Sequence, residues 1–396
     1  MLMQRLLQRR RLVVLGLNSG TSADGLDLAV VRISRSQTGL RTTFIHGHTV
    51  PYSKTLRERV LKLADARTVT LEEVVLLDNL LGQFYGQQAA SCCDDMAARN
   101  TKLHLVASHG QTVRHIPQIT RIGPYHVNGT LQLGSLDQIA AVTGLPVVGD
   151  FRQADIAIGG EGAPITTGAV QRLFGTQKSR LIVNIGGMAN YFYLPGRQTR
   201  FTLMACDCGP GNSLSDILTA QLFHRPFDRD GRLARKGHAS QRLMLYLQKE
   251  EFFKGQAQST GRETFGVYMA DKMIKHGRKL GLGNVDLVAT AAELTAITIA
   301  EAVQPLLEDD TSLSKLYLTG GGRNNMFIRE RLDAHLPDLE VGLIDDLGLD
   351  GDYVEAASYA VIGEACLRSE PINRTTRTGA AQTLRPVLGH IAQPPA

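Results

Sequence analysis

Cysteine is scarce in this sequence, and no stretch of it stays apolar for long. The cysteines are odd in number and lack the paired spacing of zinc ligands: Cys92, Cys93, Cys206, Cys208 and Cys366. This argues against a disulfide scaffold and a structural zinc site, and a reducing cytoplasm is the expected location. No run approaches the roughly 20 apolar residues of a membrane span, so no membrane association is expected.

Charged residues are also few: they make up 20% of the chain, whereas hydrophobic residues make up 43%. This composition indicates a folded protein with little disorder. The net charge is +5, and much of the excess precedes the first predicted strand, at Arg5, Arg9, Arg10 and Arg11. We interpret this run as a solvated extension and not as a nucleic-acid surface. The apolar residues 12–17 that follow are too few for a signal peptide.

The Gly-Lys-Ser/Thr triplet of a P-loop is missing, yet the chain starts with the composition of a phosphate site. An apolar strand at 12–17 runs into a glycine-rich turn, and a second strand at 28–33 follows without a helix. Gly16, Gly20 and Gly25 are expected to let the backbone approach an anion. The turn also holds hydroxyl donors and candidate metal ligands: Thr21, Ser22, Asp24 and Asp27. Such a hairpin resembles the phosphate clamp of actin-like and sugar-kinase ATPases.

The rest of the chain predicts an α/β fold with mixed strand pairing. Strand-like runs at 43–50, 103–107 and 146–148 alternate with helix-like stretches at 53–64, 71–100 and 136–144. A second strand, glycine turn and strand occupy residues 181–194, about half the chain later. At 396 residues two domains are expected, here 1–178 and 179–396, with the last helix and tail left open to return to the first. A ligand is expected in the cleft between them.

Asp207 is the strongest candidate for a catalytic base. A strand at 201–205 is predicted to deliver it to a strand end, before a turn that contains Gly209, Gly211 and Asn212. A carboxylate there can accept a proton from an attacking hydroxyl or water. The alternative is a helix N-cap, a role that Asn212 or Ser213 fills equally well.

A later strand ends in three glycines, Gly320, Gly321 and Gly322, before a helix at 326–336. Such an end permits close approach of a nucleotide. Glu355 opens the final helix, at 354–368, and either points into the cleft or favours the helix dipole.

Two further segments carry candidate substrate ligands at predicted strand ends. His109, Gln111 and Thr112 follow the strand at 103–107 and are candidates to bind sugar hydroxyls or shape the site. The alternative is that His109 is a structural residue that caps the loop. Arg152 follows the strand at 146–148 and has the fork geometry to hold a carboxylate, unless Asp150 or Asp155 neutralises it.

The order of these motifs resembles the anhydro-N-acetylmuramic acid kinase family over nearly the whole chain. The segments that carry the resemblance are residues 19–27, 108–112, 150–152, 159–164, 184–187, 207–212, 227–231 and 259–263. The resemblance implies a cytoplasmic enzyme of cell-wall recycling with the two-lobed, actin-like (ribonuclease H-like) ATPase fold. Its expected reaction converts 1,6-anhydro-N-acetylmuramic acid, ATP and water into N-acetylmuramic acid 6-phosphate and ADP.

The same resemblance implies roles for individual residues. Asp207 would deprotonate the water that opens the anhydro bridge, and Glu355 would be a second catalytic residue near the reaction centre. Arg152 is a hypothetical partner of the lactyl carboxylate. Mg²⁺ would offset phosphate charge, with Asp24 and Asp27 as its candidate ligands. The candidate ATP-binding residues are Gly20, Thr21, Ser22, Ala23, Asp24, Gly25, Leu26, Asp27, Asn184, Gly186, Gly187, Gly209, Gly211, Asn212, Gly320, Gly321 and Gly322.

The chain departs from the family pattern at a few positions. Asn18 stands where many members have methionine, Ala23 replaces a larger apolar residue, and Gly266 stands where asparagine is common. None is expected to touch the base or the phosphate glycines. Two other classes stay open, a sugar kinase without the hydrolytic step and a nucleotide-driven binding protein; a homodimer also stays open.

Overall fold

The computed structural model describes residues 2–37, 39–66, 68–196, 199, 201–249, 265–372 and 385–395. The chain divides into two compact units, Met1–Phe174 with Tyr353–Ala396, and Gly175–Asp352. The division thus falls near the expected one at 178/179, and the last helix and tail pack with the first unit. None of the helices in the described ranges has the length and apolarity needed to cross a membrane.

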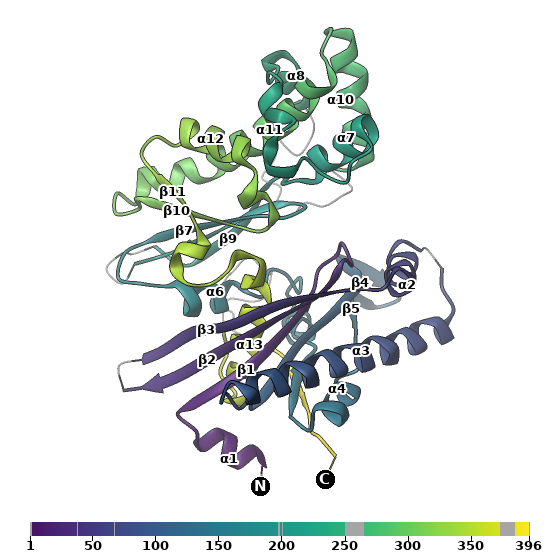
Figure 1. Ribbon diagram of the computed structural model, residues 1–396, viewed down its shortest axis with the longest axis vertical. Coiled ribbons are helices and arrows are strands. Elements are labelled where there is room, and N and C mark those ends of the chain that lie inside the picture. The colour runs from purple at the N-terminus through teal and green to yellow at the C-terminus, as the bar shows by residue number, and fades with distance from the viewer. Residues whose placement is uncertain are drawn as a thin grey trace. The chain divides into compact units, whose positions relative to one another are not determined.

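The first unit is built on a seven-stranded mixed sheet (Figure 1). Its strands are β1 (Arg11–Ser19), β2 (Gly25–Ser36), β3 (Gly39–Pro51), β4 (Leu105–Ile122), β5 (Tyr125–Leu133), β6 (Val147–Gly149) and β12 (His390–Ala392). Its helices are α1 (Leu2–Gln8), α2 (Lys54–Asp65), α3 (Leu71–Ala98), α4 (Leu136–Thr143), α5 (Gln153–Ala157), α6 (Thr167–Phe174) and α13 (Val354–Leu367).

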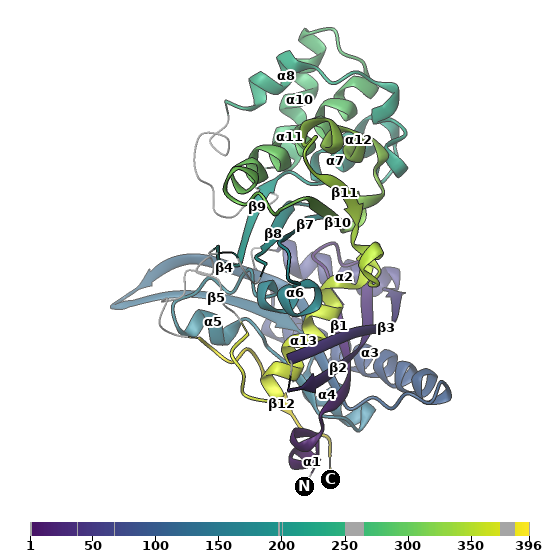
Figure 2. The same cartoon turned by 90° about the vertical axis from the view of Figure 1, so that its left-hand side faces the viewer.

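β1 is the central strand of this sheet and is buried on both faces. It pairs antiparallel with β2 and parallel with β4. Leu15 and Leu17 pack in one core with α2, α3 and α4, whereas α13 packs on the opposite face with α6 (Figure 2). Side-chain caps from Ser53 and Thr70 start α2 and α3 where the apolar periodicity begins.

The second unit repeats the arrangement around a five-stranded sheet. Its strands are β7 (Arg180–Ile185), β8 (Ala189–Leu194), β9 (Met204–Gly209), β10 (Lys315–Thr319) and β11 (Glu340–Leu343). Its helices are α7 (Ser213–Phe223), α8 (Gln241–Leu247), α10 (Val267–Lys279), α11 (Asn284–Asp309) and α12 (Met326–His335), with short 3₁₀ turns at Arg229–Gly231, Ala234–Lys236, Gly321–Asn324, Ile344–Leu347 and Gly351–Tyr353. In both views these helices gather on one side of their sheet (Figures 1 and 2).

The two sheets share one strand order. In the first unit β3, β2 and β1 form an antiparallel meander, and β4 and β6 continue it in parallel; in the second β9, β8 and β7 are followed by β10 and β11 in the same way. A repeated mixed sheet of this order is the arrangement expected of the actin-like ATPase fold. The predicted fold class is confirmed.

The basic N-terminal run extends from α1 through residues 9 and 10 to the start of β1. Its arginines are exposed, but Leu6 is buried, and Arg368 donates to the carbonyl oxygens of Leu7 and Arg9. The extension is therefore attached to the first unit at its helix.

Candidate active site

The predicted phosphate turn joins β1 to β2 in the first unit. Asn18 and Asp27 form the last paired position of the two strands. Thr21 and Ser22 are exposed on the turn, whereas Leu26 is buried and offers only backbone. Ala23 is buried too, in the left-handed region with φ 51°. The turn therefore presents two hydroxyl groups and backbone to solvent.

Close packing accounts for the missing side chain at two of the three glycines, and Gly16 lies inside β1 and not in the turn as expected. A Cβ at Gly16 would lie 1.8 Å from the carbonyl oxygen of Ala356 on α13. One at Gly25 would lie 2.5 Å from the carbonyl oxygen of Val50 on β3. Only Gly20 has open space, since its nearest neighbour would be 3.8 Å away. Of the three, Gly20 has the most open space on its Cβ side.

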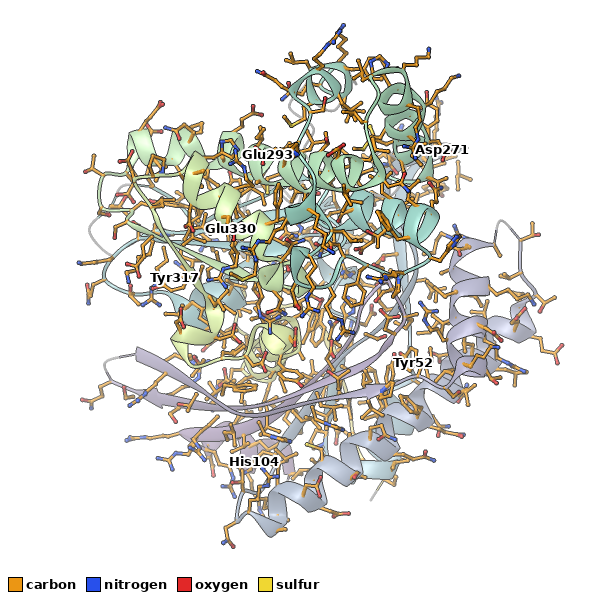
Figure 3. All side chains as sticks on the ribbon, turned by 45° about the horizontal axis from the view of Figure 1, so that its top comes forward. Tyr52, His104, Asp271, Glu293, Tyr317 and Glu330 are labelled. Carbon is orange, nitrogen blue, oxygen red and sulfur yellow. The ribbon has the colours of Figure 1, made fainter. Side chains whose placement is uncertain are left out.

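A network of buried hydrogen bonds holds the backbone at the start of this turn in place. Gln111 donates Nε2 to the Gly20 carbonyl oxygen at 3.1 Å and lies 2.6 Å from the Ser19 hydroxyl. Tyr52 (Figure 3) donates to Ser19 at 2.9 Å and contacts the Tyr85 hydroxyl at 2.7 Å. Burial raises the pKa of Tyr52 to about 12, so its phenol remains a donor at neutral pH. Gln111, expected to bind sugar, here holds the turn.

Asp24 and Asp27 do not form a closed metal cage. Asp24 is 70% exposed and lies 3.1 Å from the Arg57 guanidinium, and Asp27 accepts from Thr49 at 2.7 Å. The described part of the chain contains no group of three or more residues placed to ligate a metal. One or two carboxylates beside a phosphate site do fit Mg²⁺, which keeps most of its water and shares the phosphates of its nucleotide.

His109 and Arg152 contact each other in the first unit. Both His109 and Gln111 lie inside β4, not at its end as expected, because β4 continues to Ile122 by pairing with β5. Arg152 donates Nε to His109 Nε2 at 3.0 Å and Nη1 to the Gly162 carbonyl oxygen at 2.7 Å. Burial, reinforced by Arg152, holds the pKa of His109 well below its usual value. The ring is therefore neutral and donates Nδ1–H to the Gly110 carbonyl oxygen, 3.0 Å away.

The final helix brings Glu355 and Tyr359 to the same region of this unit. They are four residues apart and share one face of α13. The Tyr359 ring stacks on His109 with centroids 4.5 Å apart, and Glu355 Oε2 accepts from Asn18 at 2.9 Å. Burial raises the pKa of Tyr359, which Arg152 partly offsets. Asn18, Glu355, Tyr359, Arg152 and His109 thus form one chain of neighbours.

Sequence reasoning missed several polar groups beside this chain of neighbours. Gln132 on β5 donates to Thr112 at 3.1 Å. Three buried atoms in this part of the sheet have no hydrogen-bond partner among the residues described: Ser108 Oγ, His115 Nδ1 and Gln132 Oε1. Such atoms are costly unless water or a ligand pairs with them.

In the second unit two later segments contact the turn of the β7–β8 hairpin. Asn212 and Ser213 donate their backbone N–H groups to the carbonyl oxygens of Gly186 and Gly187, at 2.9 and 3.0 Å. Gly320 has φ 76°, and a Cβ there would lie 2.3 Å from Asn184 Oδ1. The predicted segments at 184–187, 209–212 and 320–322 are therefore neighbours.

Asp207 lies within β9, not beyond a strand at 201–205, because pairing with β8 extends the strand to Gly209. It is directly opposite Asn190, which is in turn opposite Asn184. Opposite residues of antiparallel strands share a face, so the three form a polar row across the hairpin. Asn190 was missed, although an asparagine in an apolar strand was a visible signal.

Arg323, also missed, fixes the Gly320 turn. It is 5% exposed and donates to the Gly320 carbonyl oxygen at 3.2 Å. Its guanidinium also contacts Asp345, Asp350 and Asp352 at 3.3, 3.1 and 2.5 Å. The motif at 259–263 lies outside the described residues.

The carboxyl group of Asp216, in the first turn of α7, is expected to make the stability of the folded protein depend on pH. Burial, and then the charge of Asp228, raise its pKa to about 7. Between the unfolded value of about 3.9 and 7 the folded state keeps a proton that the unfolded state loses, so stability falls as pH rises through this window. Asp216→Asn is expected to stabilise the protein by about 2–4 kcal/mol at pH 8 and hardly at pH 4, measured by urea unfolding. Exposed Asp333→Asn is the control, and an equal effect at both pH values would contradict the expectation.

The chain is similar to one protein family along nearly its whole length. A family model described as anhydro-N-acetylmuramic acid kinase matches residues 12–394. Relatives of that description include one from Caldanaerobacter subterraneus, 31% identical over 98% of each chain, and one from Synechocystis, 35% identical over 95% of this chain and 97% of the relative. A solved activator of 2-hydroxyisocaproyl-CoA dehydratase from Clostridium difficile, with bound ADPNP, is similar at 12% identity over 90% of this chain and 96% of that one, with a TM-score of 0.42.

Proposed function

The chain belongs to the anhydro-N-acetylmuramic acid kinase family, and from that premise we propose which of its residues carry the reaction. It is an ATP-dependent kinase of anhydro-N-acetylmuramic acid that serves peptidoglycan recycling. The finer proposal is that one turnover couples hydrolysis of the 1,6-anhydro bridge to phosphorylation of O6, in the cytoplasm.

Asp207 is the proposed base for the hydrolytic half. Its carboxylate takes a proton from water, the water oxygen bonds to the anomeric carbon, and the bond from that carbon to O6 breaks. O6 then takes the γ-phosphoryl group of ATP, and ADP leaves. The observation that carries this assignment is the row of Asn184, Asn190 and Asp207 beside the glycine segments of the second unit.

ATP is proposed to bind at the two glycine hairpins. Open space at Gly20 and the exposed hydroxyls of Thr21 and Ser22 support phosphate contacts in the first unit. The Gly186, Gly187 and Gly320 turns support nucleotide contacts in the second. Asp24 and Asp27 would hold Mg²⁺ directly or through water, and the ion would supply charge neutralisation at the phosphates.

The sugar is proposed to bind in the first unit, where His109, Thr112, Arg152 and Glu355 lie. The unpaired buried atoms of Ser108, His115 and Gln132 support a polar ligand there. Arg152 uses Nε and Nη1 within the protein and has further N–H donors. These suit the lactyl carboxylate that distinguishes muramic acid from other amino sugars.

Arg152→Ala tests this contact. It is expected to raise KM for the anhydrosugar by about 10- to 100-fold, the value of a charge-assisted hydrogen bond, and to leave KM for ATP within about twofold. Steady-state kinetics with each substrate varied would measure both. Arg114→Ala, at an exposed arginine of β4 in the same unit, is the matched control. An unchanged KM for the sugar would remove Arg152 from the binding site.

The coupled reaction is tested by isotope incorporation. The protein is incubated with ATP, Mg²⁺ and 1,6-anhydro-N-acetylmuramic acid in ¹⁸O-labelled water. Label at the anomeric hydroxyl of a 6-phosphate is the expected result. The coupled mechanism would be wrong if the sugar stayed unphosphorylated, or if ordinary N-acetylmuramic acid were phosphorylated at the same rate as its anhydro form. A rate of ATP hydrolysis that no sugar changes would indicate a nucleotide-driven binding protein.

A further inference from the structure

Asn18 is a buried polar residue at the end of β1 whose side chain reaches the final helix. It is 4% exposed, and its Nδ2 donates to Glu355 Oε2 at 2.9 Å. This contact joins the end of β1 to Glu355, one of the two residues predicted to be catalytic. The first-turn carboxylate of α13 is otherwise exposed to solvent.

The backbone explains why this contact forms. Side chains two apart on a strand share a face, so Asn18 points to the same side as Gly16. A Cβ at Gly16 would lie 1.8 Å from Ala356 O, and α13 therefore lies directly on β1 at this point. Asn18 is the next residue along that face, opposite the first turn of the helix, and there its amide meets Glu355.

A carboxylate on a long side chain samples several rotamers when one end faces water, and restricting it costs up to about 2 kcal/mol. A charge-assisted hydrogen bond to one carboxylate oxygen restricts the side chain to fewer rotamers and leaves the other oxygen available to a ligand. Tyr359, one turn further along α13, interacts with Glu355, and burial raises the pKa of its phenol, which stays neutral.

We propose that Asn18 is a positioning residue that holds Glu355 Oε2 and so presents Oε1 to the reacting sugar. The inference rests on the proposed place of Glu355 in the sugar site. Asn18 itself contacts neither substrate; it acts only through the carboxylate. It also adjoins Ser19 and Gly20, so one strand end positions both the phosphate turn and this carboxylate.

The test uses Asn18→Leu, a substitution of similar shape without a donor. It is expected to lower kcat by about tenfold and to leave KM for ATP within about twofold. The second measurement repeats the substitution in a Glu355→Ala background, where it is expected to have no further effect, because nothing is left to position. Asn79→Leu, a half-buried asparagine of α3 that donates to Val75 O, is the matched control and should retain full activity.

Two results would overturn the proposal: full kcat in Asn18→Leu, or an equal loss with and without Glu355, which would indicate a structural role. If Asn18→Leu fails to fold, Asn18→Ala removes the donor without adding a charge beside Glu355 and must pass the same cycle. Failure of the proposed function is a different outcome, since wild type would then produce no labelled sugar phosphate.

Discussion

Asp207→Asn is expected to lower kcat by about 10²- to 10⁴-fold, the range for loss of a general base, while KM for ATP stays within about twofold. Asparagine has the shape of aspartate but cannot take the proton from water. The β9 strand and its pairing with Asn190 do not depend on the charge, so the fold should be retained. Release of ADP and incorporation of ¹⁸O into the sugar should fall together.

Asp271→Asn is the matched control for this variant. Asp271 lies on α10 in the same unit, is exposed (Figure 3), and accepts from Gln221 at 3.3 Å. The control should keep wild-type kinetics. A kcat above about a tenth of wild type in Asp207→Asn would assign the base elsewhere. Continued ADP release without labelled sugar would separate phosphoryl transfer from bridge opening.

Local patterns were sufficient to predict both hairpins, because each is made by neighbouring strands joined through a short turn. β1 with β2 and β7 with β8 pair as the sequence indicated. Strand limits were harder to predict. The strands of His109 and Asp207 continue further than expected because their lengths depend on pairing with β5 and β8, and composition within one strand does not report its partner.

Contacts between distant segments were beyond sequence patterns. Asn18 and Glu355 are 337 positions apart, so no local spacing links them. The sequence also could not show that Gly16 serves a helix and not an anion, since both uses require the same missing side chain. Nothing in the sequence distinguishes Arg323 from other charged residues. In the structure three aspartates from a later loop surround its guanidinium.

Gly16→Ala is expected to lift α13 from β1. The added Cβ would lie 1.8 Å from Ala356 O and 3.0 Å from Ala360 N, both backbone atoms that cannot rotate away. Overpacking of this kind costs about 1–3 kcal/mol of stability, which thermal or urea unfolding would detect. Because Glu355 and Tyr359 are carried by the displaced helix, kcat should also fall by about 10- to 100-fold.

Gly129→Ala on β5 controls for the methyl group itself, since a Cβ there meets nothing within 4 Å. It should leave both stability and kcat near wild type. Unchanged stability in Gly16→Ala would mean that the helix can shift without cost, and the packing account would be wrong. Asn18→Leu should lose activity with little loss of stability, whereas Gly16→Ala should lose both. Comparing the two variants therefore distinguishes the effect of the Glu355 side-chain orientation from the effect of how α13 packs on β1.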